Sequence, residues 1–280
     1  MKKTRAFLKW AGGKYSLVEE INKRLPEAST LVEPFMGAGS VFLNSDFEHY
    51  VLNDINADLI NLYKELKASP DEFILDAKKL FVDLNNHDEA YYAYRKQFNE
   101  CQDIYERAIL FLYMNRHGYN GLCRYNLKGI FNVPFGKYKK PYFPEKELFF
   151  FAEKSQKVTF TCQSYTDVFA NLPKNSVVYC DPPYVPLSKT ASFTSYAKGG
   201  FNFDDQAQLA NLAERSAFDA NIPVLISNHD TILTRKIYQQ AKLDTIQVKR
   251  TISPKGGSRK KVDEIMALYM PKGMKFGPKV

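Results

Sequence analysis

The sequence contains no run of about 18 apolar residues, and this absence excludes a membrane-spanning helix of ordinary length. Its first residues, MKKTRAFLKWAGGKY, are charged but lack an apolar stretch of roughly 7–15 residues, so we expect no secretory signal. The four cysteines form no C-x-x-C pair, which argues against a zinc site and against a disulfide framework. They are Cys101, Cys123, Cys162 and Cys180. We therefore expect a cytoplasmic protein that binds no metal.

Acidic residues are absent from one long stretch. The 38 positions from Arg107 to Pro144 contain no Asp or Glu, although 31 acids among 280 residues would put about four there. The whole chain has 39 Lys and Arg, a net charge of +8 and a pI near 9.1. A basic balance alone leaves the partner open, but a long basic stretch with many aromatic residues favours a polyanion. The basic residues of the stretch 107–144 are Arg107, Arg116, Arg124, Lys128, Lys137, Lys139 and Lys140.

Strand and helix signals alternate along the remaining chain. The run TLVEPF (30–35) breaks into the turn MGAGS, helical character follows, and HYVLND (49–54) ends on Asp54. This order predicts a βαβ unit of a doubly wound sheet. Residues 57–115 then have helical periodicity. Further strands are predicted at 158–162, 176–180, 222–227, 245–252 and 264–270, with an amphipathic helix over 204–220.

These patterns predict an α/β protein with one inserted segment. Residues 1–56 and 145–280 would form a Rossmann-like sheet domain, and residues 57–144 a mainly helical insertion. The insertion ends in the acid-free stretch, which includes RHGYNGLCRYN (116–126).

The glycine turn in EPFMGAGSVF suggests a ligand site. Gly37 and Gly39 would let the backbone approach a ligand closely, and Asp54 occupies the position of a ribose-binding carboxylate. The dinucleotide fingerprint is incomplete because Phe42 stands where its last glycine would be, so a simple tight turn explains the pattern equally well. AGGKY is not a P-loop, since Tyr15 replaces the required Ser or Thr.

The segment SVVYCDPPY carries the most specific signal. A buried strand would deliver Asp181 to its carboxyl end, where α/β folds bind ligands. Pro182 and Pro183 stiffen the turn and leave its carbonyls as acceptors, and Tyr184 adds a flat ring. Together these groups suit a planar ring that bears an amine. The bland alternative is a surface turn of the same composition.

Asp181-Pro182-Pro183-Tyr184 resembles the catalytic motif of methyltransferases that act on exocyclic amines of nucleic acid bases. EPFMGAGSVF resembles their S-adenosylmethionine motif, and the motif order resembles the alpha group of adenine methyltransferases. FLKWAGGKY, HGYNGLCRYN, FNVPFGKYKKPYFP and ISNHDT are similar to the bacterial Dam family, so the resemblance covers essentially the whole chain. A cytosine-C5 methyltransferase would need a Pro-Cys nucleophile, which the sequence lacks.

The resemblance implies S-adenosylmethionine as the methyl donor and GATC in double-stranded DNA as the target. It implies transfer to the exocyclic N6 of adenine, catalysis by Asp181 to Tyr184, and flipping of the base out of the duplex. It also implies a monomer with roles in mismatch-repair strand discrimination, replication control and gene regulation. The implied cofactor contacts are Trp10, Lys14, Phe35, Gly37, Gly39, Asp54, Ser164, Tyr165 and Asp181.

For DNA, the resemblance and the side-chain chemistry together suggest specific roles. Arg124 suits a guanine edge, Leu122 a thymine methyl and Tyr119 a wedge between bases. Lys9 would link the cofactor site to a guanine contact. Phosphate contacts are expected from Arg95, Arg116, Asn120, Asn126 and Asn132. Further DNA contacts are expected from Pro134, Lys137, Tyr138 and Lys139.

Three further segments have less specific patterns. Residues 186–200 suit either a loop that orders over the flipped base or a plain flexible linker. SPKGGSRKK (253–261) suits a turn that contacts phosphates or a solvated hairpin tip, and Asn228 suits a pocket lining. His229 suits packing better than base catalysis. The alternative function is a non-catalytic nucleic-acid-binding module with a vestigial cofactor fold. A base deaminase is disfavoured because His87-Asp88-Glu89 has no P-C-x-x-C partner.

Overall fold

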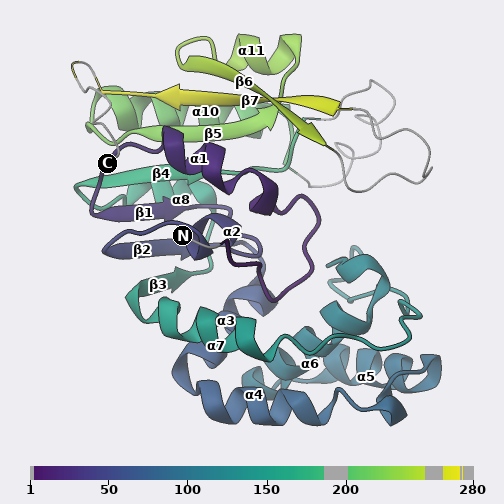
Figure 1. Cartoon of the computed structure of the whole chain (residues 1–280). Helices are drawn as coiled ribbons and strands as arrows, with labels where there is room; N and C mark the ends of the chain where they lie inside the picture. Colours follow the sequence, from purple (N-terminus) through teal and green to yellow (C-terminus); the bar gives the residue numbers. More distant parts are fainter. Residues whose placement is uncertain (1–2, 186–200, 250–260, 272, 274–280) are drawn as a thin grey trace. The chain divides into compact units, whose positions relative to one another are not determined.

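The computed structural model describes residues 3–185, 201–249, 261–271 and 273 (Figure 1). The hypotheses about the loop 186–200 and the turn at 253–260 lie outside the described residues.

The described strands form one seven-stranded mixed sheet with the order β3-β2-β1-β4-β5-β7-β6. The pairs β1–β4, β2–β3 and β4–β5 are parallel, whereas β7 runs antiparallel to both β5 and β6. The strands are β1 Thr30–Glu33, β2 His49–Asn53, β3 Val158–Thr161, β4 Ser176–Cys180, β5 Val224–His229, β6 Lys242–Lys249 and β7 Lys261–Tyr269. The predicted Rossmann-like methyltransferase sheet is therefore confirmed.

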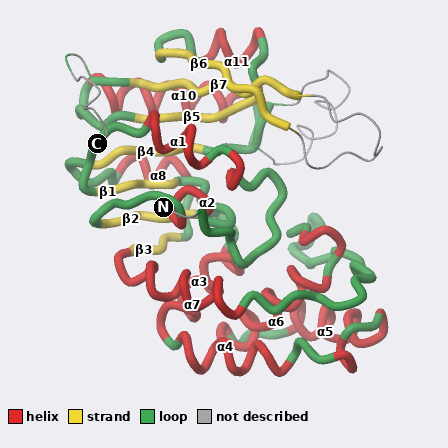
Figure 2. Tube along the Cα trace, viewed as in Figure 1, coloured by secondary structure: helices red, strands yellow, loops and turns green. Residues whose placement is uncertain are grey.

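Helices connect the strands and dominate the region that follows β2 (Figure 2). The first helices are η1 Lys14–Ser16, α1 Val18–Arg24, α2 Ser40–Leu43, α3 Ala57–Ala68, α4 Pro70–Lys79, η2 Asp83–Asn85, α5 Asp88–Glu100, α6 Ile104–His117 and η3 Tyr119–Gly121. They are followed by α7 Glu145–Lys154, η4 Ser155–Lys157, α8 Tyr165–Ala170, α10 Phe203–Phe218 and α11 Ile232–Ile237. No helix among the described residues is both long and apolar enough to cross a membrane.

Side-chain caps explain where the longer helices begin. Asn56 caps α3 and Asp103 caps α6, each by accepting from a backbone N–H in the first turn. Asn202 and Asp205 form a capping box at the start of α10. Helices α3, α6 and α10 therefore each begin at a residue whose side chain caps the first turn.

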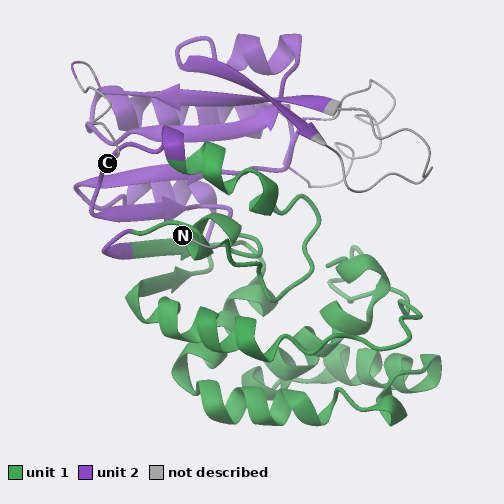
Figure 3. Ribbon diagram, viewed as in Figure 1, with its two compact units in different colours: residues 1–22, 36–46, 50–162 green, residues 23–35, 47–49, 163–280 purple. Residues whose placement is uncertain are grey.

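The chain divides into two compact units (Figure 3). Unit 1 comprises residues 1–22, 36–46 and 50–162, and unit 2 comprises residues 23–35, 47–49 and 163–280. Helices α3 to α6 share unit 1 with β3, so a separate domain limited to residues 57–144 stays a prediction.

Each unit has its own core. In unit 1 the Tyr63 and Phe151 rings stack with centroids 4.6 Å apart, and Phe7 meets Phe151 edge-on. In unit 2 every residue of β4 is buried, together with Leu209 and Ala213 of α10. A strand buried along its whole length is expected in a parallel sheet covered on both faces.

Candidate active site and DNA-reading hairpin

The glycine turn after β1 brings three predicted residues of unit 1 together. Gly37 and Gly39 have φ values of 47° and 70°, which favour glycine. The Gly37 N–H donates to the Asp54 carboxylate at 3.0 Å. A Cβ atom added to Gly37 would lie 2.7 Å from Nε1 of Trp10, so the indole packs directly against the turn.

Asp54 directly follows β2 and is half-buried. Its carboxylate accepts a second backbone hydrogen bond, from Asn56 at 3.0 Å. Burial raises the pKa of this carboxyl, and the hydrogen bonds from Asn56 and Gly37 act in the opposite direction. The carboxylate is thereby fixed beside the glycine turn, where it suits hydroxyl donors of a ligand.

Lys14 occupies a different setting from the one expected. It is buried in η1, and its ammonium donates to the carbonyl of Gly12 at 3.0 Å. The resemblance implies that Lys14 meets the methionine carboxylate of the cofactor. An ammonium has three N–H donors, so the bond to Gly12 does not exclude that contact, and the role of Lys14 stays a prediction.

In unit 2, the Asp181 carboxylate is held by the neighbouring strand. Ser227 of β5 donates through Oγ to Oδ1 of Asp181 at 3.2 Å. The Ser227 hydroxyl also forms a buried hydrogen bond of 2.9 Å with the Tyr179 hydroxyl. Because Asp181 follows a fully buried strand, its position and orientation are both constrained.

A buried amide network holds the rest of this turn. Gln206 of α10 donates through Nε2 to the Pro183 carbonyl at 2.7 Å, and its Oε1 accepts from Asn228 at 3.0 Å. The Val185 N–H donates to Oδ1 of Asn228, also at 3.0 Å. Asn228 is completely buried and braces the turn through these hydrogen bonds, and the expected lining role stays a prediction.

The two prolyl carbonyls are not equivalent. That of Pro183 is occupied by Gln206, whereas no hydrogen bond between described residues reaches that of Pro182. Pro182 immediately follows Asp181 and is itself buried, so its role as the prolyl acceptor for an amine stays a prediction.

Tyr184 is fixed at both its ring and its hydroxyl. The hydroxyl donates to Glu264 of β7 at 2.9 Å, and the ring meets that of His229 edge-on at 4.9 Å. The His229 ring is itself bonded to the Val185 carbonyl through Nδ1 at 2.7 Å. These contacts are consistent with the packing role expected for His229, which stays a prediction.

The weaker cofactor candidates also lie in unit 2. Phe35, Tyr165 and Phe201 form an aromatic cluster with centroid distances of 5.3 to 5.6 Å. Ser164 caps α8 by accepting from the Asp167 N–H at 3.1 Å, which accounts for the residue without a ligand. Phe35, Ser164 and Tyr165 remain predicted contacts.

A short hairpin in unit 1 carries the proposed base-reading residue. Tyr125 and Phe131 form an antiparallel bridge, and the Asn132 N–H donates to the Arg124 carbonyl at 3.1 Å. The exposed Arg124 guanidinium donates to Oδ1 of Asn132 at 2.7 Å. Asn126 stabilises the tip because its Oδ1 accepts from backbone N–H groups at 2.9 and 3.1 Å.

Lys9 lies beside the turn that precedes this hairpin. Its ammonium sits 3.6 Å from the centre of the Tyr138 ring and donates to the Arg116 carbonyl. The Tyr138 hydroxyl accepts from the Asn120 N–H at 2.8 Å. Burial and the neighbouring Arg116 charge lower the pKa of Lys9 to about 8.

Two of the arginines expected at phosphates are engaged inside unit 1. Arg116 is only 9% exposed, and its guanidinium donates to the carbonyls of Tyr142 and Phe7. These bonds give Arg116 a structural role, and its expected phosphate contact stays a prediction. Arg95 donates to the Val133 carbonyl at 3.0 Å but stays half-exposed.

The other predicted DNA contacts are more accessible. Tyr119 is 50% exposed and follows the end of α6, and Leu122 is half-buried. The exposed residues further along are Pro134, Lys137 and Lys139. The exposure of these residues is compatible with DNA contact, and the wedge role of Tyr119 and the DNA contacts of the others stay predictions.

Sequence reasoning missed Ser227, Gln206 and Tyr238, the residues that hold the catalytic turn. Tyr238 donates to Oε1 of Gln206 and accepts from Asn228, both at 3.0 Å. Each acts through another residue, so its side-chain type carries no chemical signature. The only signal was the polar pair Ser227-Asn228 at the end of an otherwise apolar strand.

The strand order and the motif after β4 identify the chain as a Rossmann-like methyltransferase. Within that class, the model of the family described as D12 class N6 adenine-specific DNA methyltransferase matches residues 10–252. The chain belongs to this family and is an adenine-specific DNA methyltransferase, as the resemblance implied.

Curated relatives agree over almost the entire chain. A DNA adenine methylase of Vibrio cholerae serotype O1 (strain ATCC 39315 / El Tor Inaba N16961) is 62% identical over 271 residues, covering 97% of this chain and 98% of its own. The DNA adenine methylase of Escherichia coli (strain K12) is 60% identical, with 97% of both chains covered. That of Serratia marcescens is 57% identical over 269 residues, covering 96% of this chain and 100% of its own.

Proposed function

We propose that this methyltransferase uses S-adenosylmethionine to methylate the exocyclic N6 of adenine within GATC in double-stranded DNA. The observation that carries the proposal is the pair of acceptors after β4. Asp181 is fixed by Ser227, and the adjacent Pro182 carbonyl is free of hydrogen bonds from the described residues. Two acceptors side by side suit the two N–H bonds of an aromatic amine.

The acceptors solve the main chemical difficulty of the reaction. The lone pair of adenine N6 is delocalised into the ring and is a poor nucleophile. Hydrogen bonds from the amine to Asp181 and Pro182 localise that lone pair and stabilise the positive charge that develops on nitrogen. S-adenosylmethionine would supply a methyl group on a sulfonium: the N–C bond forms as the C–S bond breaks, with that bond pair going to sulfur. The methylated nitrogen then loses one N–H proton to solvent, which gives the neutral product.

The unit 1 residues suit the cofactor. Trp10 offers a flat surface against the glycine turn, and Asp54 offers a fixed carboxylate for ribose hydroxyls. S-adenosylmethionine has no pyrophosphate, so its site does not need the complete dinucleotide fingerprint. This agrees with Phe42 at the position of the last glycine of that fingerprint. Lys14 and the aromatic cluster of Phe35 and Tyr165 are the secondary candidates.

The target adenine must leave the duplex to reach Asp181. Tyr184, fixed by Glu264 and His229, would support the flipped ring, and the exposed Tyr119 would fill the vacated stack. Arg124 is the only exposed arginine on the described hairpin 124–132, and its guanidinium suits a guanine edge. GATC as the site follows from the resemblance of residues 117–126 to the Dam family.

We further propose a monomer that acts in the bacterial cytoplasm, with roles in mismatch repair, replication control and gene regulation. These statements rest on the family resemblance. Double-stranded DNA is the only macromolecular partner that the proposed reaction requires.

A label-transfer assay tests the proposal. Purified protein is incubated with S-adenosylmethionine labelled on the methyl group and with duplexes that carry GATC or a one-base variant. We expect label on the GATC duplex and a matching change in cleavage by restriction enzymes that sense adenine methylation in GATC. Equal labelling of all duplexes would remove the site specificity. Cofactor and duplex binding without any transfer would favour the non-catalytic module.

A further inference from the structure

The hairpin that carries Arg124 has two different faces. Tyr125 and Phe131 form its bridge and point inward, where their rings meet edge-on at 5.5 Å. Arg124 and Asn132 alternate with them and bond to each other on the exposed side. Whatever fixes the inner face therefore sets the position of the outer face.

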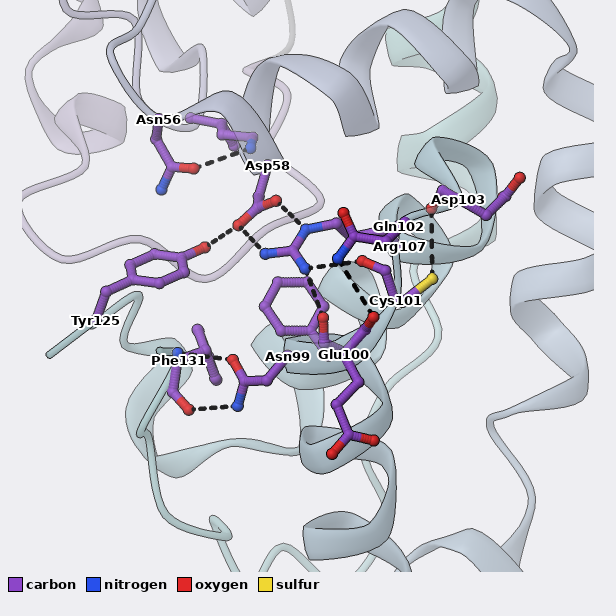
Figure 4. A network of polar contacts seen from close by, with 12 residues as sticks. Asn56, Asp58, Asn99, Glu100, Cys101, Gln102, Asp103, Arg107, Tyr125 and Phe131 are labelled. Atoms are coloured by element: carbon purple, nitrogen blue, oxygen red, sulfur yellow. Dashed lines mark hydrogen bonds and ion pairs between the residues drawn. The ribbon is translucent and has the colours of Figure 1, made fainter. Parts of the chain in front are cut away.

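The Tyr125 side of the inner face is fixed by a charged pair. Figure 4 shows Tyr125 directed toward Asp58, which also faces the Arg107 guanidinium. The Tyr125 hydroxyl donates to Oδ2 of Asp58 at 2.5 Å. Arg107 donates to both carboxylate oxygens of Asp58, at 2.5 and 3.1 Å. The carboxylate thus links the hairpin to α3 and α6.

The Phe131 side is held by α5. The side-chain amide of Asn99 accepts from the Phe131 N–H at 2.8 Å and donates to its carbonyl at 3.1 Å. The centres of the Phe98 and Phe131 rings are 5.4 Å apart. The Arg107 guanidinium lies over the Phe98 ring, 4.2 Å from its centre. Arg107 also donates to the Phe98 carbonyl, so the two anchors share one guanidinium.

We propose that Asp58, Arg107 and Asn99 are positioning residues for base recognition. They hold the inner face of the hairpin so that Arg124 presents its guanidinium in one orientation. This inference rests on the proposed function, in which Arg124 reads a base. None of the three residues contacts the base itself; each acts on Arg124 through Tyr125 or Phe131.

A positioning role differs measurably from a purely stabilising one. Loss of a stabilising contact lowers the amount of folded enzyme and affects all substrates equally. Loss of an anchor leaves the enzyme folded but lets the arginine adopt several orientations, which weakens its preference for the correct base. The ratio of activities on correct and altered sites therefore separates the two roles.

The test uses the full-length Tyr125→Phe variant, which removes one hydroxyl and keeps the ring. Its matched control is Tyr105→Phe in the same unit, because Tyr105 donates to the carboxylate of Asp76 at 3.0 Å, away from the hairpin. For each protein, kcat/KM is measured on a GATC duplex and on duplexes with one base pair changed, together with the melting temperature.

We expect Tyr125→Phe to lower discrimination by roughly three- to tenfold, as expected for mutations that act through a packed network. Tyr105→Phe should keep wild-type discrimination with a similar change in melting temperature. Asn99→Ala, which releases the Phe131 side, should change discrimination in the same direction as Tyr125→Phe.

Two results would overturn the inference in distinguishable ways. A wild-type enzyme with no preference for GATC would overturn the proposed specificity and the inference with it. The inference alone would be overturned if the wild-type enzyme prefers GATC and the Tyr125→Phe and Asn99→Ala variants keep that preference. Equal loss of activity on all duplexes in the two variants would overturn it in the same way.

Discussion

The side-chain amide of Gln206 donates a hydrogen bond of 2.7 Å to the carbonyl oxygen of Pro183. Gln206 is completely buried, and its own oxygen is bonded to Asn228 and Tyr238. The turn that holds Asp181 and Pro182 is therefore positioned by a buried polar network as well as by proline stiffness. Such networks are costly to break because each partner loses a compensating hydrogen bond.

Gln206→Leu should lower kcat for methyl transfer by roughly tenfold or more, because a loosened turn misplaces Asp181, and a displacement of about 1 Å can cost about 10²-fold in rate. Affinity for the duplex should change little, because Gln206 faces the inside of unit 2. Asn211→Leu, on the exposed side of α10, is the control and should keep wild-type kcat. Single-turnover kinetics make the comparison, and an unchanged rate for Gln206→Leu would exclude a positioning role for the network.

Gly37→Ala should weaken S-adenosylmethionine binding at least about tenfold, since the added methyl group collides with Trp10. Gly129→Ala is the matched control because Gly129 also has a positive φ, 72°, but an added Cβ meets no atom within 4 Å. Titration calorimetry measures both. Equal weakening by the two variants would assign the effect to backbone strain alone.

Duplex affinity should fall as the pH rises from about 7 to 9. The pKa of Lys9 is lowered to about 8, so its ammonium is charged below that pH and loses its proton above it. A nearby phosphate or guanine favours the charged form, and binding is therefore accompanied by proton uptake in this range. Fluorescence anisotropy at constant ionic strength measures the trend. Lys9→Met should bind more weakly at pH 7 with a flatter pH dependence, and an equally steep profile would assign the titration to another group.

Arg124→Ala should cost about 1–3 kcal/mol of discrimination at one base pair of the site. Lys128→Ala, an exposed change at the tip of the same hairpin, should weaken binding to all duplexes to a similar small extent. Competition binding with one-base variants compares the two. A uniform loss for Arg124→Ala would make Arg124 a phosphate contact.

The sequence predicted the strands because each buried strand is an apolar run with a turn signal at its end. It did not predict the strand order, and β5 and β6 begin at Val224 and Lys242 instead of at residues 222 and 245. It also located Asp54 and Asp181, since both directly follow such strands. It could not locate Ser227 or Gln206, whose role depends on which strand and helix lie next to β4. Arg116 shows a similar limit: the sequence predicted a phosphate contact from its charge, but it did not predict that its guanidinium donates to the carbonyls of Tyr142 and Phe7.

The most direct test of the account is the Asp181→Ala variant assayed for both methyl transfer and duplex binding. Removal of the carboxylate leaves the amine without its charged acceptor, so we expect transfer to the GATC duplex to be lost. Duplex affinity should stay within about threefold of wild type, because contacts to phosphates made by other residues supply most of the affinity for DNA. Intact turnover in this variant would contradict the central role of Asp181, and loss of duplex binding with residual turnover would place the residue in recognition instead.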